Sequence, residues 1–175
     1  MLHSFAKIAF TQNVRLMQDR YESRSLFGSF DIRGNAPVIF TQRETEFIET
    51  RDSFYLATVS ETGWPYVQHR GGPEGFLKVL DNKTLCFADY RGNRQYVSTG
   101  NISGNNRIAL IMVDYVERRR LKIFGLANLL HDADKPEILD YLRVPGYPAS
   151  VERAFIIQVE AFSWNCSKHI TPRNK

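Results

Sequence analysis

Hydrophobic and polar residues alternate along much of the chain, in short stretches separated by turn residues. FYLATVS (54–60) shows this period of two. It is followed by a Glu-Thr-Gly turn and then by WPYVQH (64–69), a pattern typical of a β-hairpin. The same reasoning predicts two more hairpins and one late strand. The seven predicted strands are residues 54–60, 64–69, 76–81, 84–89, 107–115, 120–131 and 154–162.

Helical spacing is confined to a few segments. Apolar residues recur at helical intervals over residues 5–20, which predicts one N-terminal docking helix. Thr41 and Glu44 have the spacing of a capping box and predict a helix over 42–50. Short helices are also predicted over 93–100 and 135–142. Many short strands with few helices favour a mainly β fold, an antiparallel barrel with helical additions.

Composition bounds the size and the environment of this fold. With 175 residues and 43% hydrophobic content, we expect a single domain, in which an N-terminal helix and arm (1–42) precede a barrel (43–175). The longest apolar run, 108–113, is far too short to span a bilayer, and the N-terminus does not resemble a secretion signal. We therefore expect a cytoplasmic protein whose Cys86 and Cys166 are reduced thiols.

Positive charge is concentrated in one part of the chain. The formal net charge is +4, whereas residues 90–122 contain seven basic and two acidic residues, a local net of 7 − 2 = +5. This excess predicts an anionic partner, either a nucleic acid backbone or a phosphorylated small molecule. The Arg118-Arg119-Arg120 run is more typical of a charged hairpin turn, although Arg120 and Lys122 share one face of the strand that follows.

Two stretches combine polar donors with glycine at strand ends. YVQHRGG places Gln68, His69 and Arg70 before Gly71 and Gly72, and such glycines let another molecule approach the backbone. ADYRGNRQYVSTGN ends a strand and places Arg94 at the predicted start of a helix, where backbone donors attract phosphate. Each stretch alone is equally typical of a polar turn. Together they indicate a nucleotide-like site.

Several other site types are excluded by spacing. Cys166 and His169 lack the second Cys/His pair that a structural zinc site needs, so no metal is expected. The chain contains neither a Gly-x-Gly-x-x-Gly strand-to-helix turn nor a P-loop. No nucleophile with a positioned base can be assembled from the sequence.

The segments quoted above, with RRRLKIFG and WNCSKHITPR, resemble the pyridoxamine 5′-phosphate oxidase-like FMN-binding split-barrel family, most closely a branch described as predicted flavin-nucleotide-binding proteins. The resemblance extends over about residues 44–173. It implies a six-stranded split β-barrel that forms a homodimer with FMN at the subunit interface. The residues that it assigns to the flavin are Gln68, His69, Arg70, Gly71, Phe87, Ala88, Asn93, Arg94, Gln95, Arg120 and Trp164.

Within this assignment, Arg94 is the best-matched phosphate ligand, and Gln95 replaces a lysine of the oxidases. No counterpart is found for the oxidase segment that holds the substrate's phosphate, or for its late Arg-x-His pair. The resemblance therefore implies an FMN-dependent oxidoreductase acting on an unidentified small substrate rather than on vitamin B6.

Two alternatives remain open at this point. One is a non-catalytic flavin-binding or sensing protein, which would need the same residues. The other is a nucleic-acid-binding barrel, although the tyrosines of the basic segment are not regularly interleaved with its cations. We expect neither a nucleic acid nor a membrane as partner.

Overall fold

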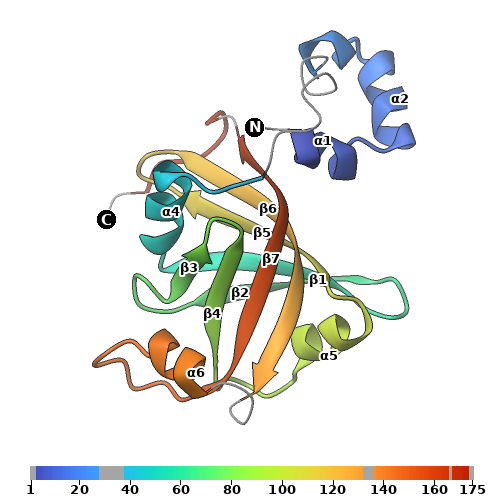
Figure 1. The fold of residues 1–175 in the computed structure, drawn as a ribbon. Helices are drawn as coiled ribbons and strands as arrows, with labels where there is room; N and C mark the ends of the chain where they lie inside the picture. The colour runs from blue at the N-terminus through green and yellow to red at the C-terminus, as the bar shows by residue number, and fades with distance from the viewer. Residues whose placement is uncertain (1–2, 28–37, 132–135, 166, 174–175) are drawn as a thin grey trace.

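The computed structural model describes residues 3–27, 38–131, 136–165 and 167–173. Seven antiparallel strands form one sheet with the order β2-β1-β5-β6-β7-β4-β3 (Figure 1). The strands are β1 (Ser53–Val59), β2 (Pro65–Gly71), β3 (Leu77–Asp81), β4 (Thr84–Tyr90), β5 (Arg107–Asp114), β6 (Arg119–His131) and β7 (Val151–Asn165). The predicted mainly β fold and its three hairpins are confirmed.

Two details of the strands differ from prediction. The sheet has seven strands where the resemblance implied six. The last strand, β7, extends at both ends beyond the predicted 154–162, because it pairs along its length with β6 on one side and with β4 on the other. Polar residues at its ends weaken the apolar pattern there, so that periodicity alone detects only its central part.

The sheet is curled but is not closed by backbone pairing among the described residues. β2 and β3 are its two edges, and β2 crosses β4 in the view of Figure 1. Arg70 of β2 contacts Asp89 of β4, which links the two strands through side chains alone. The split in the barrel therefore lies between β2 and β4.

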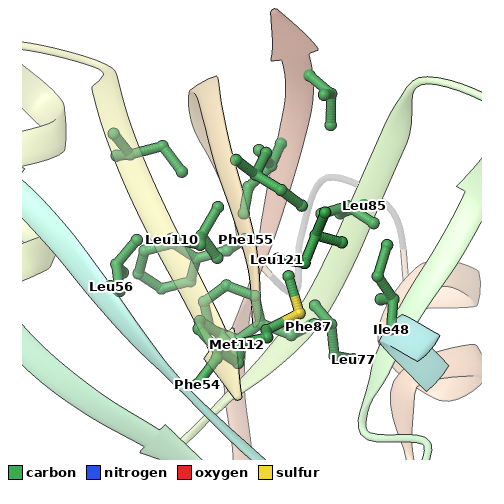
Figure 2. Close-up of a cluster of buried hydrophobic side chains, with 14 of the residues drawn as sticks. Ile48, Phe54, Leu56, Leu77, Leu85, Phe87, Leu110, Met112, Leu121 and Phe155 are labelled. Carbon is green, nitrogen blue, oxygen red and sulfur yellow. The ribbon is translucent and has the colours of Figure 1, made fainter. Parts of the chain in front are cut away.

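Aliphatic and aromatic side chains together fill the inside of the curled sheet (Figure 2). Phe87 stacks on Phe155 with 4.7 Å between ring centroids, and Phe54 meets Phe87 edge-on at 5.0 Å. All three are almost completely buried. Such pairs add about 0.5–1.5 kcal/mol each beyond their burial. These three rings form a packed aromatic layer beneath the split.

Beyond the N-terminal helices, the described residues include three helices that pack on the barrel. α4 (Gln42–Glu49) begins at the predicted capping box of Thr41 and Glu44. α6 (Pro136–Leu142) packs on the outer face of β4 and β7, where Leu139 and Leu142 bury Cys86. Residue 135, the predicted first residue of this helix, lies outside the described residues.

The third helix, α5 (Val97–Gly104), corrects the predicted helix over 93–100. Tyr96 immediately before it has a left-handed backbone, with φ 54° and ψ 21°, and Arg94 also has a positive φ of 60°. These conformations cannot continue a right-handed helix. Residues 93–95 are therefore a loop that precedes the helix.

The N-terminal segment forms two helices where one was predicted. α1 (His3–Ala9) and α2 (Gln12–Arg20) are separated at Thr11, whose extended backbone and side chain cap the start of α2. The short η1 (Arg24–Phe27) follows, and the rest of the predicted arm, 28–37, lies outside the described residues. Phe5 of α1 stacks on Phe124 of β6 at 5.2 Å and so attaches this segment to the sheet. Among the described residues, no helix is long and apolar enough to cross a membrane.

Candidate functional site

A cavity of about 350 Å³ opens at the split between β2 and β4. Its other walls are the loop after β4, the start of α5 and part of the segment that leads into β7. Nine of the eleven residues predicted to contact a ligand line it. They are Gln68, His69, Arg70, Gly71, Phe87, Ala88, Asn93, Arg94 and Gln95.

Alternation along β2 divides its predicted donors between two faces. Tyr66, Gln68 and Arg70 are half-buried on one face, and the Tyr66 hydroxyl is hydrogen-bonded to Gln68 Oε1. His69 is exposed, and its ring packs edge-on against Tyr55, 5.5 Å between centroids. Because successive side chains of a strand point to opposite faces, Gln68 and Arg70 direct their polar groups to one side and His69 to the other.

The two glycines at the end of β2, Gly71 and Gly72, have neighbours within the chain that sequence analysis did not foresee. A Cβ atom at Gly72 would lie 2.7 Å from the ring of Phe76, and one at Gly71 would lie 3.0 Å from the His69 ring. Gly72 is therefore required by the packing of Phe76. Only Gly71 borders the cavity.

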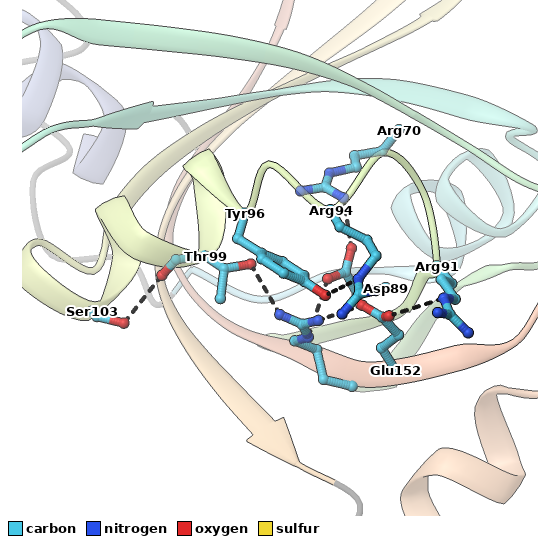
Figure 3. Close-up of polar contacts among 9 residues, drawn as sticks. Arg70, Asp89, Arg91, Arg94, Tyr96, Thr99, Ser103 and Glu152 are labelled. Atoms are coloured by element: carbon cyan, nitrogen blue, oxygen red, sulfur yellow. Dashed lines mark hydrogen bonds and ion pairs between the residues drawn. The ribbon is translucent and has the colours of Figure 1, made fainter.

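A buried carboxylate joins the two sides of the split (Figure 3). Asp89 Oδ1 lies 2.6 Å from a terminal nitrogen of Arg70, and Asp89 Oδ2 lies 3.4 Å from Arg153 Nε. Burial raises the pKa of Asp89, and the charges of Arg70 and Arg153 oppose this shift without cancelling it. The Arg70 guanidinium also lies over the Phe155 ring at 5.3 Å, so the cluster rests directly on the aromatic core.

A β-bulge adds a second acid to this cluster. The β4–β7 register shifts between Asp89, opposite Arg153, and Tyr90, opposite Val151, which leaves Glu152 as an extra residue. Glu152 Oε2 accepts a hydrogen bond of 2.5 Å from Arg153, and Glu152 Oε1 lies 3.8 Å from Arg91 Nε. Sequence analysis missed Asp89, Glu152 and Arg153, because neither a bulge nor the approach of distant strands leaves a local signal.

The start of α5 offers backbone donors to the cavity. The left-handed Tyr96 followed by helical Val97 is the arrangement in which successive N–H groups form an anion-binding concavity. No side chain caps this helix start. Arg153 contacts this helix start. Its guanidinium lies 4.8 Å from the Tyr96 ring centroid and 3.4 Å from Thr99 Oγ1.

Arg94 stands at the mouth of the cavity. Its side chain is exposed, and its Nε donates a hydrogen bond of 3.1 Å to the Tyr96 hydroxyl. That contact raises the pKa of Arg94. Asn93 Oδ1 accepts a hydrogen bond from the Gln95 N–H at 3.1 Å and so shapes the loop that carries Arg94.

Three buried polar atoms of the cavity wall have no hydrogen-bond partner within the described part of the chain. They are Arg70 Nε, Tyr90 Oη and Ser98 Oγ. Leaving a buried polar group unsatisfied costs about 1–3 kcal/mol. Their concentration in one cavity indicates a site built for a polar ligand.

The remaining two predicted residues, Arg120 and Trp164, do not line the cavity within one chain. Trp164 Nε1 donates a hydrogen bond of 2.8 Å to Glu44, and the Arg43 guanidinium lies 4.5 Å above its ring. Arg120 is two residues before Lys122, whose ammonium group lies over Phe5 of α1. In one chain Trp164 therefore belongs to the attachment of α4, and Arg120 lies on the same face of β6 as Lys122.

The arginine-rich turn is partly neutralised by the chain itself. Asp114 lies 3.0 Å from a terminal nitrogen of Arg51 and 3.7 Å from one of Arg119. Burial alone would raise the pKa of Asp114, but the Glu117 N–H and these arginines lower it. Among the described residues, no group of three side chains suited to a metal ion occurs.

The family model described as pyridoxamine 5′-phosphate oxidase matches residues 40–157, more than half of the chain. This chain belongs to that family. The match includes the cavity-lining parts of β2, β4 and α5 and ends within β7. No curated protein gave a significant sequence match.

Solved structures of the same fold come from several bacteria. A putative pyridoxamine 5′-phosphate oxidase from Lactobacillus delbrueckii is 19% identical, with a TM-score of 0.56 over 73% of this chain and 95% of its own. HupZ of Group A Streptococcus is 18% identical, with a TM-score of 0.54 over 78% and 100%. A protein from Clostridium acetobutylicum related to general stress protein 26 is 19% identical, with a TM-score of 0.50 over 74% and 88%. At these identities the likeness shows the fold alone.

Proposed function

We propose that this protein binds FMN in the cavity between β2, β4 and α5 and acts as an oxidoreductase on a small substrate. The observation that carries the proposal is the set of unsatisfied polar atoms of Arg70, Tyr90 and Ser98 in one cavity. FMN has a phosphate and a ring with polar edges, so it has acceptors for these donors. Membership of the pyridoxamine 5′-phosphate oxidase family supports the same cofactor.

The phosphate would bind at the start of α5. The N–H groups after Tyr96 form an uncapped anion-binding concavity, and Arg94 stands beside it. The net charge of the side chains around Asp89 is 4 − 2 = +2. The four positive ones are Arg70, Arg91, Arg94 and Arg153, and the two negative ones are Asp89 and Glu152. A doubly charged phosphate is therefore electrostatically matched.

The flavin ring would lie along β2, where Gln68 and Arg70 present donors on the face opposite His69. Asp89 holds Arg70 in place, so this donor is oriented before the ligand arrives. Bound FMN supplies electron and hydride transfer, and the protein supplies binding, orientation and electrostatics. None of the described residues is assigned a catalytic acid or base role.

We also propose a homodimer in which a second copy completes the cavity. Arg120 and Trp164 match flavin contacts of the family, yet they do not line the cavity of their own chain. Contact with FMN therefore requires that they come from the other subunit. The start of β6, which bears Arg120, and the end of β7, which bears Trp164, would then belong to the interface.

FMN binding is tested by dialysing the purified full chain and then titrating it with FMN. We expect saturable quenching of flavin fluorescence at one FMN per chain. A protein that is colourless and does not change FMN fluorescence would refute the proposal.

Turnover is tested separately on the loaded protein. After photoreduction, rapid reoxidation by oxygen, a quinone or a nicotinamide indicates an oxidoreductase. Retention of FMN without reaction towards every one of these partners favours the binding or sensing alternative.

A further inference from the structure

A second cavity, of about 560 Å³, adjoins the first. It lies between the end of α6, the chain that follows this helix, and the paired ends of β4 and β7. The residues that border it alone are Asp140, Arg143, Val144, Pro145, Ser150 and Val151. Its volume is within the range of small-molecule sites, about 300–1,000 Å³.

The two cavities share a wall made by two tyrosines. Tyr90 and Tyr147 meet edge-on with 5.0 Å between ring centroids, and both residues border both cavities, as does Ala149. Tyr90 comes directly after the bulge at Asp89, which sets the position of its ring at the end of β4. A ligand in the second cavity would be separated from the first cavity by these two rings and Ala149.

The lining of the second cavity has a defined chemistry. Val144, Pro145 and Val151 are apolar, and the two tyrosine rings provide surfaces on which another ring stacks. The buried hydroxyl of Tyr90 has no partner within the described residues. A carbonyl group is a suitable acceptor for such a hydroxyl.

One cation stands at the rim of this cavity. Arg143 Nε lies 3.3 Å from Asp140 Oδ1, but both side chains are about two-thirds exposed. An exposed pair of this kind contributes little stability, so the arginine is readily shared with an anion. The rim therefore favours an acidic substituent on the ligand.

We propose that the second cavity binds a planar aromatic carbonyl compound that carries an anionic group. This inference rests on the proposed function in one respect, namely that the ligand beyond the tyrosine wall is FMN. Tyr90, Tyr147 and Ala149 border both cavities, whereas the other lining residues, which belong to α6, the chain after it and the start of β7, are not assigned to FMN. The second ligand and the cofactor bind together.

The probe for this test is 1,4-naphthoquinone-2-sulfonate, which has a planar ring, two carbonyl groups and a negative charge. Binding to the full chain is measured by calorimetry, with and without FMN. We expect Arg143→Gln to lower the affinity for the probe about fivefold, because the sulfonate loses its contact with the arginine at the rim. Val144→Trp fills the cavity and should abolish probe binding, whereas neither variant changes FMN affinity.

Arg107→Gln is the matched control. Arg107 is an exposed arginine that borders a different cavity, at the end of α5, so this variant should bind the probe normally. Thermal unfolding of each variant establishes that it is folded. Arg143→Gln keeps the test decisive if Val144→Trp fails to fold, because the Arg143 side chain is largely exposed.

The outcomes separate the two proposals. Probe binding that is unaffected by Arg143→Gln, or that is abolished by FMN, overturns the second site. Probe binding that depends on Arg143 in a chain unable to bind FMN supports the second site and refutes the proposed cofactor. Simultaneous binding of both, with the Arg143 dependence, supports both.

Discussion

At the scale of single residues, the cavity depends on a few charged side chains with different exposure. Asp89 is buried between two arginines, whereas Arg94 is exposed at the mouth and donates a hydrogen bond to the Tyr96 hydroxyl. Substitution of a buried charge changes the wall itself. Substitution of an exposed one changes only what the cavity offers to a ligand.

Arg94→Ala should weaken FMN binding by about tenfold or more, the effect of losing a charged hydrogen bond to phosphate. Because the side chain is exposed, the melting temperature should stay unchanged. Fluorescence titration measures the affinity, with Arg107→Ala as the same-charge control outside the cavity. An Arg94→Ala chain with wild-type affinity would remove Arg94 from the phosphate site.

Asp89→Asn should alter how stability depends on pH. The pKa of Asp89 is raised above its ordinary value of 3.8, so the folded protein binds this proton more tightly than the unfolded chain. The contribution of this group is fully present below 3.8 and is lost as the pH rises through the raised folded value. Relative to Asp89→Asn, the wild-type protein should therefore gain stability on acidification across that window.

Melting temperatures of both proteins between pH 3 and pH 7 measure this difference. Asp89→Asn should also weaken FMN binding, because Arg70 and Arg153 lose the carboxylate that orients them. Parallel pH profiles for the two proteins would show that Asp89 titrates normally in the fold.

At the scale of elements, α4 is attached to the barrel through its first turn. Glu44 accepts hydrogen bonds from the Thr41 N–H, at 3.1 Å, and from Trp164 Nε1, at 2.8 Å. A single carboxylate thus caps the helix and also holds the end of β7. The ring of Phe47, edge-on to Trp164 at 4.8 Å, adds an apolar contact.

Glu44→Ala should lower the free energy of unfolding by about 1–2 kcal/mol, the scale of a lost helix cap. Burial alone would raise the pKa of Glu44, but its hydrogen bonds lower it below 4.5. This contribution is present above 4.5 and is lost as the pH falls through the lowered folded value. Urea unfolding at several pH values measures both the loss of stability and its pH dependence. Glu46→Ala is the control, because Glu46 is exposed and lies in the same helix two residues after Glu44.

How far the elements follow from sequence depends on how local their causes are. The hairpins and α4 were predictable, because alternation and a capping box are contained in a few neighbouring residues. The break at Thr11 was not, since its cap competes with a helical pattern that continues on both sides. Nor was the start of α5, where Tyr96 adopts a backbone rarely used by a bulky residue.

The residues of the candidate site also divide into those that the sequence marks locally and those that it does not. Gln68, Arg70 and Arg94 line the cavity, and strand ends and a glycine turn mark their positions locally in the sequence. Asp89 and Arg153 were missed, because they become a pair only when β4 lies against β7. A lone acid and a lone arginine carry no signal in sequence.

At the scale of the whole molecule, the open sheet and the placement of Arg120 and Trp164 predict that two chains share each site. Light scattering should give twice the chain mass. Mixed dimers provide the sharper measurement. If the two residue sets come from different subunits, a mixed Arg94→Ala and Arg120→Ala dimer keeps one intact site and one doubly altered site.

Equal mixing and random pairing should therefore restore about one intact site per four chains, although each variant alone binds FMN poorly. FMN stoichiometry after co-refolding measures this value. No recovery on mixing would place both residues in the same subunit's site.

The bulge at Glu152 has a consequence for insertions and deletions in this fold. Asp89 pairs with Arg153 and Tyr90 with Val151, so the ladder is in register on both sides of the extra residue. Removing Glu152 would leave every other strand partner unchanged while taking one negative charge from the cavity wall. A change in chain length by one residue can thus retune the attraction for anions without altering the barrel.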